Sequence, residues 1–197
     1  MKIAVDAMGG DHAPQNIVAG AIEALRDNGA MTRLFFVGDR PRVEAELQRR
    51  GVQDGRIEIV HTTEVIEMED SPVQAVRRKK DSSMSRAIDL VKRGEADAVV
   101  SAGNTGALMT AAHLKLRTLE GIDRPALAVR LPAPKHAFIL IDAGANLEPH
   151  ASNLVQYGIM GSQYAQRILN YRNPRVAVFS IGTEEMKANA SSLKWNR

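Results

Sequence analysis

Residues 3–14, IAVDAMGGDHAP, join a short apolar run to two adjacent glycines and then to a proline. The run Lys2 to Asp6 predicts a β-strand, because its apolar residues are followed directly by turn-forming ones. Gly9 and Gly10 predict a tight turn that lets the backbone approach a ligand, and Pro14 predicts the start of a helix. A strand that leads through a glycine turn into a helix is typical of the β-α units of a parallel sheet.

The same alternation of short apolar runs and amphipathic stretches continues along the chain. It predicts an α/β fold built around a mostly parallel sheet. Strands are expected at residues 2–6, 33–37, 56–61, 96–101, 126–131, 137–142 and 175–180, helices at 14–28, 41–50, 82–93, 104–119 and 152–171, and a connecting loop at 62–71.

Individual residues inside these elements lead to further predictions. Asn104 stands where the N-cap of its helix is expected. Residues 137–142 form the most hydrophobic strand, so they are expected at the centre of the sheet. Gly158 and Gly161 share one face of the last helix, which predicts close approach of a neighbouring segment. Composition gives no sign of a domain boundary, so a single α/β domain is the default expectation.

Composition excludes several classes of protein and partner. Of the 197 residues, 44% are hydrophobic and 25% are charged, which is typical of a soluble globular protein, and no aliphatic run is long enough to cross a bilayer. The absence of cysteine excludes disulfides, thiolate metal sites and a cysteine nucleophile. With a net charge of +3 and only 4% aromatic residues, nucleic acid is not an expected partner. We expect a cytoplasmic protein.

Three glycine-rich segments follow predicted strands: DAMGGDHAP at 6–14, SAGNTGA at 101–107 and DAGAN at 142–146. Such turns meet at the carboxyl edge of a parallel sheet, where backbone N–H groups and helix N-termini bind anions. Each segment alone is more often an ordinary loop, but three at one edge favour an anion-binding site. The glycine patterns of dinucleotide-binding and ATP-binding loops are both absent from the sequence, and no cofactor is predicted.

Histidine and basic side chains provide two further candidate features. The five histidines have no metal-ligand spacing, so no metal site is predicted. His12 lies in the first glycine turn, where it could donate a proton, although an ordinary surface histidine is the alternative. The pattern GxSxG is absent, which argues against a serine hydrolase. The run Arg77-Arg78-Lys79-Lys80 is either a solvated face or a docking patch for an acidic protein, phosphates or anionic lipid headgroups.

Six blocks of sequence together resemble the bacterial phosphate acyltransferase family of phospholipid synthesis, often called PlsX. They are IAVDAMGGDHAP at 3–14, SPVQAVRRKKDSSM at 71–84, ADAVVSAGNTGALM at 96–109, DAGAN at 142–146, LVQYGIMGSQYA at 154–165 and IGTEEMK at 181–187. The resemblance implies reversible transfer of a fatty acyl group from acyl carrier protein to inorganic phosphate, giving acyl phosphate. Because phosphate is an anionic nucleophile and a thioester is already activated, such a reaction needs no enzyme nucleophile.

The resemblance also implies an architecture and a set of partners. The fold would be a three-layer α/β sandwich similar to that of phosphotransacetylase and isocitrate dehydrogenase, with residues 1–187 as the N-terminal part of the acyltransferase domain. Residues 188–197 resemble nothing in the family and are expected to form a separate tail, so the fold is expected to be incomplete at its C-terminus. Expected partners are acyl carrier protein, inorganic phosphate, a second copy of the chain and, downstream, a glycerol-3-phosphate acyltransferase of the membrane. Family members also associate peripherally with the membrane.

We expect phosphate near the Gly9-Gly10 turn and the helix start at Ser101 to Thr105. Its expected ligands are Gly9, Gly10, Asp11, Ser101, Asn104 and Thr105, of which the last two would donate hydrogen bonds from their side chains. His12 and Lys187 are the candidate acids for the departing thiol, and together with Asn104 they form the predicted catalytic set. The basic run 77–80 is expected to dock the acidic carrier protein.

Two other functions stay open. One is an inactive, truncated remnant that retains only a phosphate-binding or dimerisation region. The other is a relative of the phosphotransacetylase or isocitrate dehydrogenase type that uses a different acyl donor or substrate. Turnover with a carrier-protein thioester, compared with a coenzyme A thioester, distinguishes these possibilities.

Overall fold

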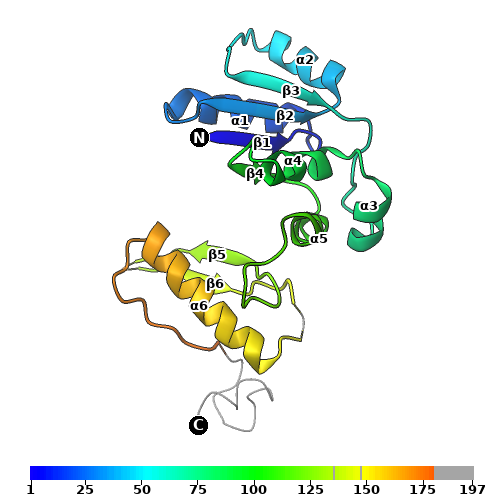
Figure 1. The fold of residues 1–197 in the computed structure, drawn as a ribbon. Helices are drawn as coiled ribbons and strands as arrows, with labels where there is room; N and C mark the ends of the chain where they lie inside the picture. Colours follow the sequence, from blue (N-terminus) through cyan, green and yellow to red (C-terminus); the bar gives the residue numbers. More distant parts are fainter. Residues whose placement is uncertain (135, 147, 180–197) are drawn as a thin grey trace. The chain divides into compact units, whose positions relative to one another are not determined.

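The computed structural model describes residues 1–134, 136–146 and 148–179. The chain divides into two compact units, Met1–Arg117 and Thr118–Arg197, which are described one at a time (Figure 1). The first unit contains a four-stranded sheet, and the second contains a two-stranded sheet. The first two glycine turns therefore belong to one unit, and the third belongs to the other.

The sheet of the first unit is parallel throughout. It consists of β1 (Lys2–Asp6), β2 (Arg33–Gly38), β3 (Ile57–His61) and β4 (Ala98–Val100), in the spatial order β3-β2-β1-β4. Each crossover between parallel strands needs a long connection, and the amphipathic segments supply it as helices. The predicted parallel sheet and the predicted positions of these four strands are confirmed.

Helices cover both faces of this sheet, as a parallel sheet requires. Helices α1 (Gln15–Asp27) and α2 (Arg40–Arg49) cover one face and α4 (Ser83–Lys92) covers the other, while α5 (Thr105–Leu116) packs on α4 and on α3 (Pro72–Arg78). Side chains of β1 and β2 alternate between the two faces. One set, which includes Ile3, Val5 and Phe36, packs with residues of α1 and α2, and the other, which includes Ala4, Phe35 and Val37, packs with residues of α4. These are the three layers that the resemblance implies.

Helix α3 is absent from the sequence prediction. It follows the predicted loop 62–71 at once, with Pro72 in its first turn and Ala75 and Val76 buried against α4 and α5. Seven residues are too few to show a clear apolar period, although serine followed by proline is a recognised helix start. The helix therefore depends on tertiary packing for its stability.

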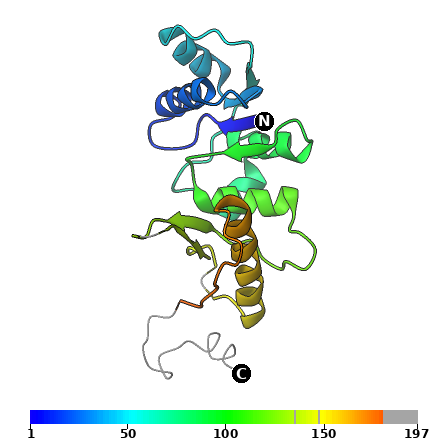
Figure 2. The ribbon, with the colours of Figure 1, turned by 90° about the vertical axis from the view of Figure 1, so that its left-hand side faces the viewer.

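The second unit contains an antiparallel pair of strands, β5 (Ala128–Leu131) and β6 (Phe138–Ile141). The prediction that the hydrophobic strand at 137–142 is the centre of the parallel sheet is wrong, because β6 belongs to a different sheet. The physical reason is the connection: residues 132–137 are too few for a parallel crossover, which needs about a dozen residues, and they suit a hairpin. Figure 2 shows this hairpin beside helix α6 (Ala151–Ile168), which packs on β6.

The glycines of α6 allow the close approach that the sequence predicts. A Cβ atom at Gly161 would lie 3.1 Å from Ile141 Cγ2 in β6, which is tighter than most real contacts. The strand predicted at 175–180 is wrong over the part that is described, since residues 175–179 are irregular and Phe179 is 83% exposed. Ser180 and the predicted tail 188–197 lie outside the described residues. Among the described helices, none combines the length and apolar character needed to cross a membrane.

Candidate functional site

The first two glycine turns begin at neighbouring strand ends. Strands β1 and β4 pair in parallel with Val5 opposite Val100, so Asp6 and Ser101 come next at the same edge of the sheet. The Ser101 hydroxyl donates a hydrogen bond to Asp6 Oδ2 over 2.7 Å, and its oxygen accepts one from the N–H of Gly103 over 3.1 Å. The other carboxylate oxygen of Asp6 accepts from the N–H of Met8 over 3.3 Å. A direct contact therefore links the two turns.

Glycine is required where the two turns touch. A Cβ atom at Gly9 would lie 2.5 Å from Asp6 Oδ2, 2.9 Å from the Gly103 nitrogen and 3.0 Å from Ser101 Oγ. Gly10 has a φ of +107°, a conformation that favours glycine, and its Cβ would lie 3.1 Å from the carbonyl oxygen of Ala102. The backbone of the first turn thus lies directly against the backbone of the second.

Asn104 joins the second turn to a third segment, the loop before α3. Its side-chain oxygen accepts from the N–H of Ala107 over 3.0 Å, so the predicted N-cap of α5 is confirmed. Its side-chain amide donates to the carbonyl oxygens of Glu67, Met68 and Asp70 over 3.3, 3.0 and 3.0 Å. The amide hydrogens that the sequence assigns to phosphate are therefore directed to this loop.

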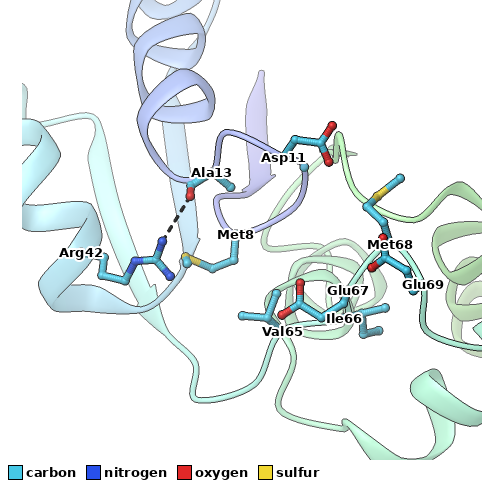
Figure 3. Close-up of a pocket in the computed structure, with 10 residues that line it drawn as sticks. Met8, Asp11, Ala13, Arg42, Val65, Ile66, Glu67, Met68 and Glu69 are labelled. Atoms are coloured by element: carbon cyan, nitrogen blue, oxygen red, sulfur yellow. Dashed lines mark hydrogen bonds between the residues drawn. The ribbon is translucent and has the colours of Figure 1, made fainter.

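A cavity of about 280 Å³ lies between the first turn and the loop that Asn104 holds (Figure 3). Arg42 of α2 reaches into it and donates to the carbonyl oxygen of Ala13 over 3.2 Å. Among the described residues that line it, Arg42 is the one basic side chain, and Asp11, Glu67 and Glu69 supply three carboxylates. The excess of carboxylates makes the inside of this cavity unfavourable for an anion.

Lys79 also holds the loop that lines the cavity. Its ammonium group contacts the Asp70 carboxylate at 2.5 Å and donates to the carbonyl oxygen of Val65 over 2.8 Å. The hydrogen bond from Lys79 to the Asp70 carboxylate, and a second one from the N–H of Glu67, lower the pKa of Asp70 from its ordinary value. The exposed members of the basic run are therefore Arg77, Arg78 and Lys80, whereas Lys79 is half-buried in a structural ion pair.

The lowered pKa of Asp70 predicts a stability that depends on acid pH. A carboxyl group with a depressed folded pKa stabilises the fold above its unfolded pKa of about 4, and this contribution is lost as the pH falls through the folded value. We expect Lys79→Met to destabilise the chain more at pH 7 than well below the folded pKa, where only its hydrogen bond to Val65 is lost. Urea unfolding of both proteins across this range measures the effect. Lys80→Met, which changes an exposed neighbour, is the control, and an equal loss at all pH values would contradict the prediction.

Comparison with known proteins indicates the family to which this chain belongs. A family model described as "Fatty acid synthesis protein" matches residues 1–196. The chain belongs to this fatty acid synthesis protein family. Relatives named "Phosphate acyltransferase" include one from Alkaliphilus oremlandii, which is 48% identical over 95% of this chain and 55% of its own length. Another, from Desulfitobacterium hafniense strain Y51, is 50% identical over 96% of this chain and 56% of its own length. The chain thus spans about half the length of the relatives it matches.

A solved structure supports the fold of this family member independently. The EutD phosphotransacetylase from Staphylococcus aureus superposes with a TM-score of 0.60, at 20% identity, over 84% of this chain and 52% of its own. At that identity the likeness establishes the fold alone, which is the phosphotransacetylase-like architecture that the family resemblance implies.

The third glycine segment of this family member has a different setting from the first two. It follows β6 in the second unit, so the expectation of three turns at one sheet edge is wrong. The Asp142 carboxylate accepts from the N–H groups of Leu127, Ala145 and Asn146 over 2.8, 3.3 and 2.7 Å, and from the Asn146 side chain over 2.9 Å. These contacts fix the turn after β6 and explain the segment as a structural element.

The remaining predicted residues occupy several environments. Asp11 and His12 are exposed in the first turn, and Thr105 is exposed at the first position of α5. Lys187 lies outside the described residues. Among the described residues, no three histidine or acidic side chains come together in a way that could hold a metal ion.

Two residues of the site are missing from the sequence prediction. Asp6 carries a signal, because it is the acidic residue that ends a buried apolar strand and is itself 1% exposed. A buried carboxylate needs hydrogen-bond donors, and here a serine and a backbone N–H supply them. Arg42 has no such signal, since it lies among the many charged residues of α2.

Proposed function

We propose that the protein acts in the transfer of a fatty acyl group from acyl carrier protein to inorganic phosphate, forming acyl phosphate for phospholipid synthesis. The observation that carries the proposal is the contact of two glycine turns beside the N-terminus of α5, in a chain whose relatives are named phosphate acyltransferases. Backbone N–H groups at the start of a helix favour a dianion.

The chemistry of this transfer suits a chain without cysteine. An oxygen of hydrogen phosphate attacks the thioester carbonyl carbon, a C–O bond forms and the C–S bond breaks. The proton of hydrogen phosphate balances the charge on the departing sulfur, which leaves as a thiol. The protein then has to align the two substrates and stabilise the oxyanion, and no covalent enzyme intermediate is needed.

The described residues suggest how phosphate is held. Gly10 and Asp11 would contribute backbone N–H groups from the first turn, where the N–H of Gly9 faces the carbonyl oxygen of Asp6 over 3.5 Å, and Thr105 would contribute from the start of α5. The cap bond of Asn104 uses the N–H of Ala107, which leaves the N–H groups of Thr105 and Gly106 at the tip of the helix. We assign Asn104 the task of positioning this tip. Candidate acids for the thiol are His12, exposed in the first turn, and Lys187.

Phosphate-dependent consumption of the thioester tests the proposal. The chain is incubated with acyl-acyl carrier protein, with and without inorganic phosphate, and acyl phosphate is trapped with hydroxylamine. Formation of acyl phosphate supports the proposal. A strong preference for acyl-coenzyme A would favour the phosphotransacetylase alternative. A cooperative thermal melt without turnover on either thioester would favour the inactive remnant.

We also propose that the exposed basic residues dock the acidic carrier protein. Arg77, Arg78 and Lys80 are exposed together at the end of α3 and just after it, while Lys79 is paired inward. The triple change to glutamate is expected to lower the association rate about tenfold at low salt and to flatten its salt dependence. Stopped-flow association measures this, with Lys92→Glu on α4 as the control. Unchanged rate and salt dependence would contradict the docking role.

We further propose that the chain forms a homodimer and associates peripherally with the membrane. A glycerol-3-phosphate acyltransferase of the membrane would then consume its product. Acyl phosphates are reactive anhydrides, so an enzyme that consumes them close to where they form limits their hydrolysis. Sedimentation of the chain with and without anionic vesicles tests the membrane association and the oligomeric state together.

A further inference from the structure

We infer that Asp6 and Ser101 are a positioning pair that locks the first glycine turn to the second, so that their backbone groups converge on one anion. The inference rests on the proposed function, because it explains how the same phosphate site is preorganised. It gives Ser101 a task other than direct contact with phosphate, and it gives a task to Asp6.

The hydrogen bonds of Ser101 determine what its side chain can do. A serine hydroxyl has a single proton to donate, and this proton is directed to Asp6 Oδ2 over 2.7 Å. The hydroxyl oxygen accepts from the N–H of Gly103 over 3.1 Å. With its proton committed to a carboxylate, Ser101 cannot donate to phosphate at the same time. It therefore connects Asp6 to the second turn.

The hydrogen bonds of Asp6 extend this connection to the first turn. Its second carboxylate oxygen accepts from the N–H of Met8 over 3.3 Å, and the residue as a whole is 1% exposed. Hydrogen bonds to an ionised, buried group are stronger than those between neutral groups. One carboxylate thus holds Met8 on one side and, through Ser101, Gly103 on the other.

Close packing of the two backbones makes the pair sensitive to any displacement. A Cβ atom at Gly103 would lie 3.2 Å from the Cα atom of Gly9, so the turns are in van der Waals contact directly beside the pair. Donor groups that are fixed before the ligand arrives bind it without a further ordering cost. The negative charge of Asp6 repels a nearby anion, so its benefit to the site lies in fixing the turns.

Amide hydrogen exchange measured by NMR, without any ligand, tests the lock. Ser101→Ala keeps the carboxylate and removes the connection, and Asp6→Asn keeps the shape and weakens it. Both are expected to speed exchange at the Met8 and Gly103 amides by roughly tenfold relative to the rest of the unit. The matched control is Ser82→Ala, a buried serine whose hydroxyl accepts from the N–H of Ser85 at the start of α4 and makes no hydrogen bond to Asp6 or Ser101 among the described residues. Exchange in Ser101→Ala that matches the control would overturn the inference.

Binding of inorganic phosphate, measured by calorimetry, tests the consequence for the site. The dissociation constant of Ser101→Ala is expected to rise roughly tenfold, while that of Ser82→Ala stays within about twofold of the unchanged protein. Faster exchange with an unchanged dissociation constant would overturn the preorganising role. Faster exchange in Ser101→Ala, together with no binding by the unchanged protein, would support the lock and contradict the proposed function, so the two ideas fail separately.

Discussion

Gly9→Ala is expected to destabilise the first unit by about 3 kcal/mol, the upper part of the range for overpacking a rigid site. The new methyl carbon would lie 2.5 Å from Asp6 Oδ2 and 2.9 Å from the Gly103 nitrogen. One of these atoms belongs to a buried carboxylate and the other to backbone, so neither can move aside as the end of a flexible side chain could. The two turns have to separate, and the hydrogen bond between Asp6 and Ser101 is lost with them.

Urea unfolding of the chain measures this effect, with Gly20→Ala as the matched control. Gly20 lies exposed in α1 with no atom within 4 Å of the position of a new Cβ. Alanine is favoured over glycine inside a helix, so this control is expected to stabilise the chain by about 0.5–1 kcal/mol. If the two substitutions shift the midpoint equally, the turns are not in the close contact described.

Most of the first unit could be predicted from the sequence because its signals are local. The strand Lys2–Asp6, the glycine turn after it and the helix α1 each follow from neighbouring residues, and Asn104 is recognisable as a cap from its place before an apolar period. The central place predicted for the strand at 137–142 is wrong because hydrophobicity alone does not distinguish a parallel from an antiparallel strand, whereas the short link at 132–137, also visible in the sequence, does.

The site was less predictable because its key contacts join distant segments. The bond between Asp6 and Ser101 spans 95 positions and exists because β4 lies beside β1, an order that no local pattern specifies. The same holds for Lys79, which looks like part of a solvated basic run until its partner Asp70 is known. Glycines mark where backbones meet, but the sequence does not say which segments meet there.

Asn104 offers the second large effect, because one side chain performs two separable tasks. Asn104→Ala removes the cap of α5 and the donors to the loop at 67–70, and is expected to cost ~2–3 kcal/mol. Asn104→Ser keeps a capping oxygen but is too short to reach the loop, so it is expected to recover ~1 kcal/mol of that loss.

The difference between the two variants measures the cap, and the loss of stability that remains in Asn104→Ser relative to the unchanged protein measures the hold on the loop. Ser82→Ala removes the side-chain oxygen that caps the start of α4, so its cost calibrates the capping part. Urea unfolding gives all three values, and limited proteolysis at residues 65–70 reports the loop directly. Both Asn104 variants should be cleaved faster than Ser82→Ala, because each leaves the carbonyl groups of Glu67, Met68 and Asp70 without the side-chain amide. If Asn104→Ser instead matches the unchanged protein in stability and cleavage, the amide contributes nothing to the loop, and Asn104 returns to consideration as a direct phosphate donor.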